Sequence, residues 1–169
     1  MNYREATINE MDFNPFERIG NEWMLVTAGD EEKLNTMTAS WGQAGIMWGM
    51  PVVNVFLRPQ RYTREFVDSS DRFTLSFFGP DACRDELFTL GTKSGRDGDK
   101  LAETGLKARY FEGVPAIGGA KIILLCRKLY QHDLSPDGFN DKNVDEKNYA
   151  KKDYHRMYIA QIEKIFLAD

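Results

Sequence analysis

The sequence predicts a mainly β fold: an antiparallel sheet or barrel with a few short helical insertions. Six or seven segments have the β-branched and aromatic composition of strands, against two or three short helical patterns. Strands do not alternate with long helices, as they do in parallel sheets. The 169 residues suffice for one domain with a sizeable core, and we expect residues 1–169 to form a single domain.

The first quarter of the chain predicts one helical turn and a β-hairpin. In "NPFERIG", Asn14 can cap the turn, Pro15 suits its first helical position and Gly20 can end it. The runs 23–28 and 35–41 then flank a polar turn, which is typical of a hairpin.

A third strand is expected at "PVVNVFLR", residues 51–58, which is β-branched and aromatic. Residues 62–69 have helical spacing and connect it to the strand 72–78. A second helix is predicted over residues 82–90.

Asp81 can cap this second helix, and Gly91 supplies its stop. The Gly-rich polar loop 91–100 follows. Asp99 can then cap a short helical segment over residues 100–104, closed by a glycine.

The last third predicts two strands, a polar loop and an ambiguous end. Residues 106–111 and 121–132 have strand composition, whereas residues 134–153 are so polar that we expect a surface loop, mobile or acting as a lid. The final segment 155–168 fits a helical stripe or an interrupted strand face, and periodicity alone favours the helix.

Charge and composition exclude several classes of protein. With 22 basic and 26 acidic residues the net charge is −4, so no broad basic surface is available for a nucleic-acid backbone. The apolar stretches fall short of the roughly 20 residues that span a bilayer, and the N-terminus lacks an apolar signal core. Two cysteines, Cys83 and Cys126, are too few for a secreted disulfide framework, so we expect a cytoplasmic protein.

No standard catalytic or metal motif is present. "GTKS" lacks the spacing of a Walker-type phosphate loop, and no G-x-G-x-x-G opens a helix after a strand. His132 and His155 match no zinc spacing, so we expect no metal site. If the chain is an enzyme, a bound organic cofactor is therefore expected to carry the chemistry.

Three polar patches remain, and each has two interpretations. "LRPQRYTREF" carries Arg58, Arg61 and Arg64, which could form a solvated turn or a pocket for an anion. The alternating hydroxyls of "NTMTASWG" could face water, or could bind a flat ring or a phosphate. "TKSGR", residues 92–96, could be a hydrophilic loop or an anion-binding nest.

In order and spacing, "NTMTASWG", "RPQRYT" and "TKSGR", joined by "FTLSFFG", resemble the flavin reductase-like, FMN-binding split-barrel family, and within it the flavoredoxin-like branch. The similarity covers residues 23–98 and then 153–166. It implies an antiparallel split barrel that forms a homodimer and binds FMN non-covalently near the subunit interface. It also implies that the final segment is a strand.

The resemblance further implies which residues contact the flavin. The hydroxyl-rich strand would line the ring, the R-P-x-R-Y-T and T-K-S-G segments would hold the phosphate, and the S-F-F strand would border the ring. Arg61 is favoured for the phosphate, Arg58 is second, and Arg64 is expected to face solvent. The implied contacts are Asn35, Thr36, Met37, Thr38, Ala39, Ser40, Trp41, Arg58, Gln60, Arg61, Tyr62, Thr63, Phe77, Phe78, Thr92, Lys93 and Ser94.

One departure from the family concerns the nicotinamide donor. Many NAD(P)H-using members have a G-D-H motif before the final strand, where this chain has Asp153, Tyr154 and His155. His155 is the candidate catalytic residue, although a structural role competes. The resemblance implies an FMN-dependent oxidoreductase that takes electrons from NAD(P)H. The alternatives are an electron carrier that exchanges electrons with a protein partner and has no nicotinamide site, and a non-catalytic domain of the same fold.

Overall fold

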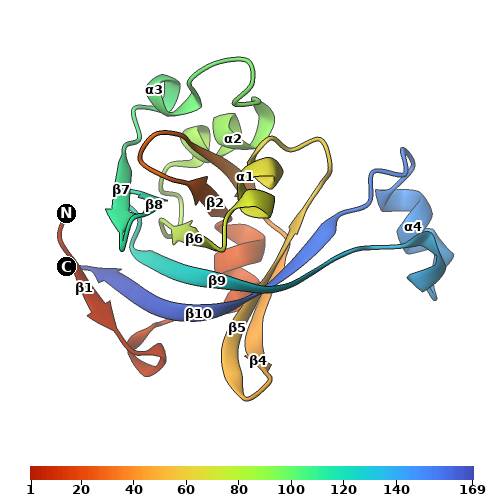
Figure 1. Cartoon of the computed structure of the whole chain (residues 1–169), viewed down its shortest axis with the longest axis horizontal. Helices are drawn as coiled ribbons and strands as arrows, with labels where there is room; N and C mark the ends of the chain where they lie inside the picture. Colours follow the sequence, from red (N-terminus) through yellow and green to blue (C-terminus); the bar gives the residue numbers. More distant parts are fainter.

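A curved antiparallel sheet forms the body of the computed structural model, which describes residues 1–169 (Figure 1). Its strand order is β3-β2-β6-β9-β10-β5-β4, β1 pairs with β10, and β7 with β8 forms a separate two-stranded sheet. The strands are β1 (Tyr3–Ala6), β2 (Met24–Gly29), β3 (Leu34–Ala39), β4 (Gly42–Met47), β5 (Met50–Leu57), β6 (Arg72–Phe77), β7 (Ala108–Phe111), β8 (Val114–Ile117), β9 (Ile122–Asp133) and β10 (Arg156–Ala168).

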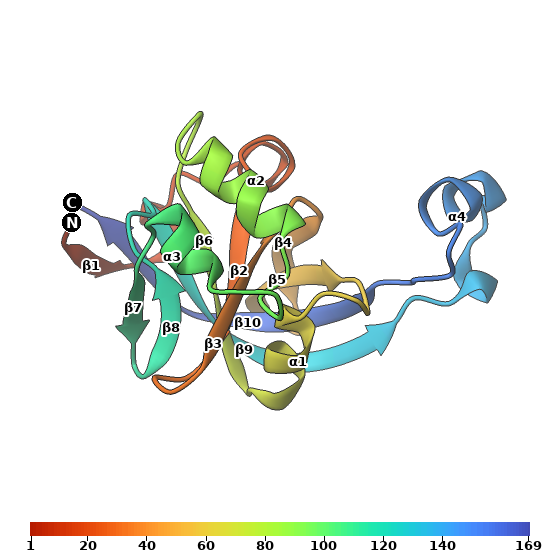
Figure 2. The ribbon, with the colours of Figure 1, turned by 90° about the horizontal axis from the view of Figure 1, so that it is seen from above.

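Short helices connect and cover these strands. In Figure 2, α2 and α1 lie on different sides of the strands, and α3 lies beside α2. The helices are α1 (Thr63–Ser69), α2 (Arg84–Thr92), α3 (Lys100–Thr104) and α4 (Lys142–Asn148), with the short helical turns η1 (Ile8–Glu10), η2 (Phe16–Asn21) and η3 (Pro136–Gly138). The predicted fold class, mainly antiparallel β with short helical insertions, is confirmed. No helix is long and apolar enough to cross a membrane.

Two apolar clusters hold the fold together. The larger has 20 buried residues from the sheet and α1, including Phe73, Leu75 and Tyr158. The smaller has 8 buried residues, including Leu25 of β2 and Leu87 of α2. It packs α2 and β8 against the other face of β2. Burying this much apolar surface is the main stabilising term, and it fixes α2 against β3 and β2.

The final segment is the strand β10, which pairs with β5 and β9 along most of its length. The family resemblance predicted this strand, whereas the helical stripe was misleading. The pairing with β9 shifts register at Ile159/Ala160 and again at Ile162/Lys164. Such bulges move side chains to the other face, so the strict alternation of a strand is lost in the sequence.

Three short strands, β1, β4 and β8, were not predicted. β4 contains two glycines and is exposed along much of its length, so its composition gives little strand signal. A two-residue turn of Trp48 and Gly49 joins it to β5, with φ values of 53° and 74°. Tight hairpin turns need positive φ, but a tryptophan at that position is not a recognisable turn signal.

The polar segment 134–153 is not only a loop, as was predicted. It contains η3 and α4, which stand at the end of β9 and β10, away from the rest of the molecule in both views (Figures 1 and 2). Asp141 caps α4 by accepting a hydrogen bond from the Asn143 backbone, at 3.0 Å. Most of its side chains face solvent, which explains the polar composition, but Asp145 and Tyr149 are buried.

Two glycines expected to end helices lie inside them instead. Gly20 is within η2, and Gly91 is within α2, which begins after Cys83 rather than Asp81. A Cβ at Gly91 would lie 3.3 Å from the Thr38 Cβ. The missing side chain therefore allows α2 to pack closely on β3, a tertiary role that the local sequence does not reveal.

Candidate functional site

Two neighbouring cavities lie between β3, the β5–α1 connection and the end of α2. We call them the polar cavity, of about 200 Å³, and the aromatic cavity, of about 290 Å³. Arg61 lines both of them. The polar cavity is lined by Asn35, Gln60, Arg61, Tyr62, Thr63, Gly91, Thr92, Lys93, Ser94, Gly95 and Lys100. The aromatic cavity is lined by Met37, Thr38, Ala39, Ser40, Trp41, Phe56, Arg58, Arg61 and His155.

Most of the residues predicted from sequence meet here. Of the 17 predicted flavin contacts, all but Thr36, Phe77 and Phe78 line one of the two cavities. Residues 35–41, 58–63 and 92–94 are distant in sequence, and the packing of α2 and α1 on β3 brings them together. The structure thus gathers the three polar patches into one place.

Two cations at the polar cavity have no carboxylate partner. Arg61 donates from Nη1 to the Gly91 carbonyl at 2.8 Å and from Nη2 to the Leu90 carbonyl at 3.3 Å. Lys100, only 5% exposed, donates from Nζ to the Thr36 carbonyl at 2.7 Å and to the same Leu90 carbonyl at 3.3 Å. Both side chains therefore keep N–H groups without protein partners beside the cavity.

The end of α2 explains how two positive charges are tolerated here. The last carbonyls of a helix carry partial negative charge, which favours cations. This compensation is incomplete: burial lowers the pKa of Lys100 to about 8, and the Arg61 charge adds to the effect. Burial also lowers the pKa of Arg61. The polar cavity therefore has a positive wall that an anion would complete.

A glycine shapes the wall of the polar cavity. A Cβ on Gly95 would lie 2.2 Å from Oδ1 of Asn35, closer than any real contact. Asn35 is itself fixed, because its Nδ2 donates to the Thr63 hydroxyl at 2.8 Å. The 92–96 loop can lie against β3 only because residue 95 has no side chain.

The row of hydroxyls on β3 is used differently from the prediction. Thr36 is buried and its hydroxyl lies 2.8 Å from that of Thr27, while Thr38 donates to the Leu87 carbonyl of α2 at 2.5 Å. These two hydroxyls serve internal packing. Ser40 at the end of the row is exposed and lines the aromatic cavity.

The other basic residues of the segments 57–66 and 92–96 are paired with acids. Arg58 donates from Nη1 to Asp153 Oδ2 at 2.6 Å and lines the aromatic cavity. Lys93, at the rim of the polar cavity, is bonded to Glu103. Arg64 was expected to face solvent, but it lies 3.3 Å from Asp133 and its side chain is 14% exposed. Arg61 thus differs from Arg58 and Arg64 in lacking a carboxylate.

Phe77 and Phe78 lie away from both cavities. Phe77 is fully buried in the larger cluster and contacts Phe13 edge-on, with 5.0 Å between ring centroids. Phe78 belongs to the smaller cluster under α2. The structure gives them packing roles, and neither lines the two cavities, so their predicted place beside a flavin ring stays a prediction.

His155 and Trp41 form one wall of the aromatic cavity. Their ring centroids lie 4.9 Å apart, and Trp41 is 44% exposed at the cavity mouth. His155 Nδ1 lies 2.8 Å from the Tyr149 hydroxyl. Burial lowers the pKa of His155 to about 4, and the neighbouring Arg58 charge adds to this. The histidine is therefore neutral at physiological pH, and the cavity offers aromatic surfaces beside the two arginines, Arg58 and Arg61.

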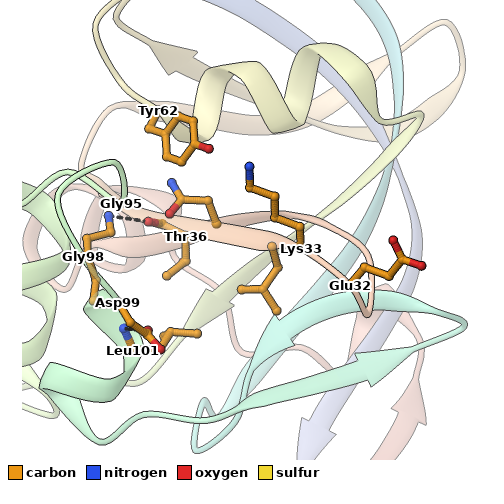
Figure 3. A pocket seen from close by; sticks show the side chains of 11 residues that line it. Glu32, Lys33, Thr36, Tyr62, Gly95, Gly98, Asp99 and Leu101 are labelled. Carbon is orange, nitrogen blue, oxygen red and sulfur yellow. Dashed lines mark hydrogen bonds between the residues drawn. The ribbon is translucent and has the colours of Figure 1, made fainter.

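A third cavity, of about 450 Å³, adjoins the polar cavity behind Asn35 and Gly95 (Figure 3). In Figure 3 the loop of Gly95 and Gly98 lies on the left with Tyr62 above it, and Lys33 and Glu32 lie to the right. Lys100, which lines this cavity and the polar one, was missed by the sequence analysis. One signal was available: a lysine at the first position of a helix opposes the helix dipole, which indicates another role.

Comparison with known proteins agrees with this arrangement. The flavin reductase like domain, as a family, matches residues 16–169. An FMN-binding domain of a flavin reductases-like enzyme from Shewanella baltica OS155 has a TM-score of 0.69 and 20% sequence identity, covering 98% of this chain and 77% of that chain. No curated protein is significantly similar.

Two further solved structures are similar in fold. The FMN-binding protein from Thermus thermophilus with bound p-hydroxybenzaldehyde has a TM-score of 0.66 at 24% identity, covering 87% of this chain and 71% of that one. Flavoredoxin from Methanosarcina acetivorans has a TM-score of 0.66 at 19% identity, with coverage of 88% and 69%. The family match extends over nearly the whole chain, and the fold is that of FMN-binding split barrels. The chain belongs to the flavin reductase-like family.

Proposed function

We propose that this protein is an FMN-dependent oxidoreductase that takes electrons from NAD(P)H. The observation that carries the proposal is a pair of cations, the half-buried Arg61 and the buried Lys100, which face the polar cavity without any carboxylate partner. A buried charge without a counter-ion is costly unless a ligand supplies the opposite charge. A phosphate monoester is an anion of suitable size for a cavity of about 200 Å³.

The residues present fit FMN. Arg61 and Lys100 would hold the phosphate, with Thr63 and Ser94 close by to donate hydroxyl hydrogen bonds. The adjoining aromatic cavity, with Trp41, would take the ring system. Because Arg61 lines both cavities, one ligand with a phosphate at one end and a planar group at the other would span them.

When bound, FMN would supply two-electron chemistry, accepting electrons from NAD(P)H and passing them to an acceptor. The chain's own contribution is binding and orientation, because no side chain at the cavities is set up as a nucleophile. Arg61 and Lys100 anchor the phosphate, while Ala39 and Trp41 contribute apolar surface against the ring. The polar groups are preorganised by their bonds to the carbonyls of α2, so little rearrangement is needed on binding.

A homodimer is part of the proposal. Large apolar side chains are exposed on η2 and on the β4–β5 hairpin: Phe16 at 84%, Ile46 at 73% and Trp48 at 55%. Cavities of about 480 and 510 Å³ continue this surface from η2 across β4 and toward α4. Contiguous exposed apolar surface is typical of protein interfaces. Since Trp41 borders both this surface and the aromatic cavity, a second copy would sit beside the flavin.

A visible spectrum tests the proposed activity. Purified protein supplied with FMN should be yellow, and it should bleach anaerobically on addition of NADH or NADPH. A yellow protein that neither nucleotide reduces would instead be the electron carrier. A colourless protein after incubation with FMN would contradict the whole proposal and leave the non-catalytic domain.

Light scattering coupled to size-exclusion chromatography tests the dimer. The chain of 19.4 kDa should elute with twice that mass. Ile46→Lys should shift the protein toward monomers, because a charge would replace an exposed apolar side chain on β4. Val144→Lys, on α4, probes the other end of the same surface. Monomeric wild-type protein at micromolar concentration would rule the dimer out.

A further inference from the structure

His155 and Tyr149 form a hydrogen-bonded pair at the wall of the aromatic cavity. Tyr149, directly after α4, is 3% exposed, and His155, directly before β10, is 7% exposed. The Tyr149 hydroxyl lies 2.8 Å from His155 Nδ1, and neither side chain has another hydrogen-bond partner in the protein. The rings meet edge-on, with 5.6 Å between their centroids. The direction of this one bond decides which imidazole nitrogen carries the proton.

The buried hydroxyl settles that direction. A phenol has one O–H, and a neutral imidazole has one N–H. If His155 donated from Nδ1, the Tyr149 proton would be buried without an acceptor, which folded proteins avoid. If Tyr149 donates to Nδ1, both groups are satisfied. The imidazole proton must then be on Nε2.

Neither member of the pair is charged at neutral pH. Burial, with the Arg58 charge adding to it and Asp153 opposing it, lowers the pKa of His155 to about 4. Burial likewise raises the pKa of Tyr149. Of the charged groups that act on the pair, Arg58 and Asp153 are bonded to each other at 2.6 Å, and Asp145, which acts on Tyr149, lies 3.8 Å from Lys152. This end of the aromatic cavity is therefore close to neutral.

The second ring nitrogen of His155, Nε2, is the one left to meet a ligand. It has no hydrogen-bond partner in the protein, and because it is not a buried unpaired atom it reaches accessible surface. That surface is the aromatic cavity, which His155 lines beside Trp41. A free N–H donor beside the Trp41 ring is complementary to a planar ligand with an oxygen acceptor. The neutral His155 donor, beside the paired Arg58 and Asp153, adds no charge that would favour a carboxylate over an uncharged oxygen.

We propose that Tyr149 is a positioning residue that fixes His155 as a neutral Nε2–H donor toward the carbonyl oxygen of a planar ring bound in the aromatic cavity. The identity of that ring rests on the proposed function, because the flavin ring and the nicotinamide carboxamide both carry such an oxygen. The tautomer itself depends only on the geometry of the free protein.

Nitrogen-15 NMR of histidine-labelled, flavin-free protein tests the tautomer. The chain has two histidines, so His132→Ala assigns both sets of signals. At pH 7 the wild type should show His155 protonated on Nε2 and bare on Nδ1. Tyr149→Phe should remove this preference and populate the other tautomer. Protonated Nδ1 in the wild type, or unchanged His155 signals in Tyr149→Phe, would overturn the proposal.

Tyr154→Phe is the matched control. Tyr154 stacks on Tyr149, with 4.8 Å between ring centroids, but its hydroxyl donates to Asp145 at 2.9 Å. The substitution removes a hydroxyl from the same aromatic cluster but leaves the hydrogen bond to His155 in place. The nitrogen signals of His155 should stay at their wild-type positions, and a shift equal to that of Tyr149→Phe would mean that general packing, not the Tyr149 bond, sets the tautomer.

Hydrogen exchange of Nε2–H identifies the acceptor. Slower exchange with FMN alone would assign a flavin carbonyl, and slower exchange only after NAD⁺ is added to FMN-loaded protein would assign the carboxamide. No slowing with either ligand would overturn the donor role toward a carbonyl. If the protein binds no FMN, the proposed function fails, while the measurement on flavin-free protein still decides the role of Tyr149.

Discussion

Two groups of basic side chains lie near α1, and they differ in what neutralises them. Arg64 and Arg156 share two carboxylates, with Arg156 Nε lying 2.6 Å from Asp133 and Nη1 3.3 Å from Asp68. Arg61 and Lys100 bond only to main-chain carbonyls. The first group is electrically complete within the chain, whereas the second is complete only with an anion. Charge balance therefore distinguishes Arg64, which is paired within the chain, from Arg61, which we propose binds the phosphate, within a single ten-residue stretch.

Arg61→Ala should have the largest effect, a loss of FMN affinity. Hydrogen bonds to charged groups contribute about 1.5–3 kcal/mol each, which corresponds to a loss of roughly 10- to 100-fold in FMN affinity. Quenching of flavin fluorescence on titration measures it. Arg64→Ala, the matched change in the paired group, should leave FMN affinity within about twofold. Equal losses in the two variants would contradict the comparison.

Lys100→Met should weaken FMN binding by about tenfold, and it should also remove the pH dependence of FMN affinity. In the free protein the pKa of Lys100 is lowered to about 8, so its charge is lost as the pH rises through that value. A bound phosphate favours the charged form, so wild-type affinity for FMN should fall above pH 8. Titrations from pH 6.5 to 9.5 measure this.

Riboflavin, which lacks the phosphate, is the control for this pH series. Its affinity should stay level across the same range in both proteins. A wild-type FMN affinity that does not change above pH 8 would mean that Lys100 does not face the phosphate.

Asp68→Asn probes the paired group and should affect stability instead of binding. Asp68 accepts a hydrogen bond from the buried Tyr158 hydroxyl at 2.6 Å and pairs with Arg156. Because the carboxylate is partly exposed, we expect a loss of about 1–2 kcal/mol in the free energy of unfolding. Urea denaturation of the flavin-free protein measures it. A large drop in FMN affinity without loss of stability would show that the two groups are not separate.

Gly95→Ala should have the smallest effect. The new methyl group would displace Asn35 from the wall of the polar cavity, at a cost of about 1 kcal/mol or slightly more, so FMN affinity should fall about fivefold. Gly98→Ala is the control in the same loop, since its Cβ would meet only Glu103, at 3.8 Å. If the two alanine variants bind FMN equally well, the close approach of the loop to β3 has no role in binding.

The sequence predicted the family, the sheet and most of the residues that line the two cavities, because these depend on local patterns and their order. It missed Lys100, whose role arises only when α3 is placed under β3 and α2. It misassigned Arg64, because Asp133 is distant in sequence and its proximity comes from the pairing of β9 with β10. It did not reveal that Phe77 is buried in the larger cluster, since a strand pattern cannot tell which face α2 and β8 will cover.

The hydroxyl row on β3 shows the same limit. Alternation placed Thr36, Thr38 and Ser40 on one face, but only the tertiary structure reveals that Thr27 and α2 occupy the first two hydroxyls. Element boundaries failed for a related reason: Gly91 is a packing glycine against Thr38, not a helix stop. Spacing along the chain thus identified the residues, and packing between elements decided which of them are free to bind.

The affinity of flavin-free protein for FMN, compared with that for riboflavin, tests the central claim most directly. The two ligands share the ring and differ in the phosphate, so the ratio isolates the contribution of Arg61 and Lys100. With two charged groups contributing about 1.5–3 kcal/mol each, FMN should bind at least about 100-fold more tightly. Equal affinities would show that the uncompensated cations do not form a phosphate site.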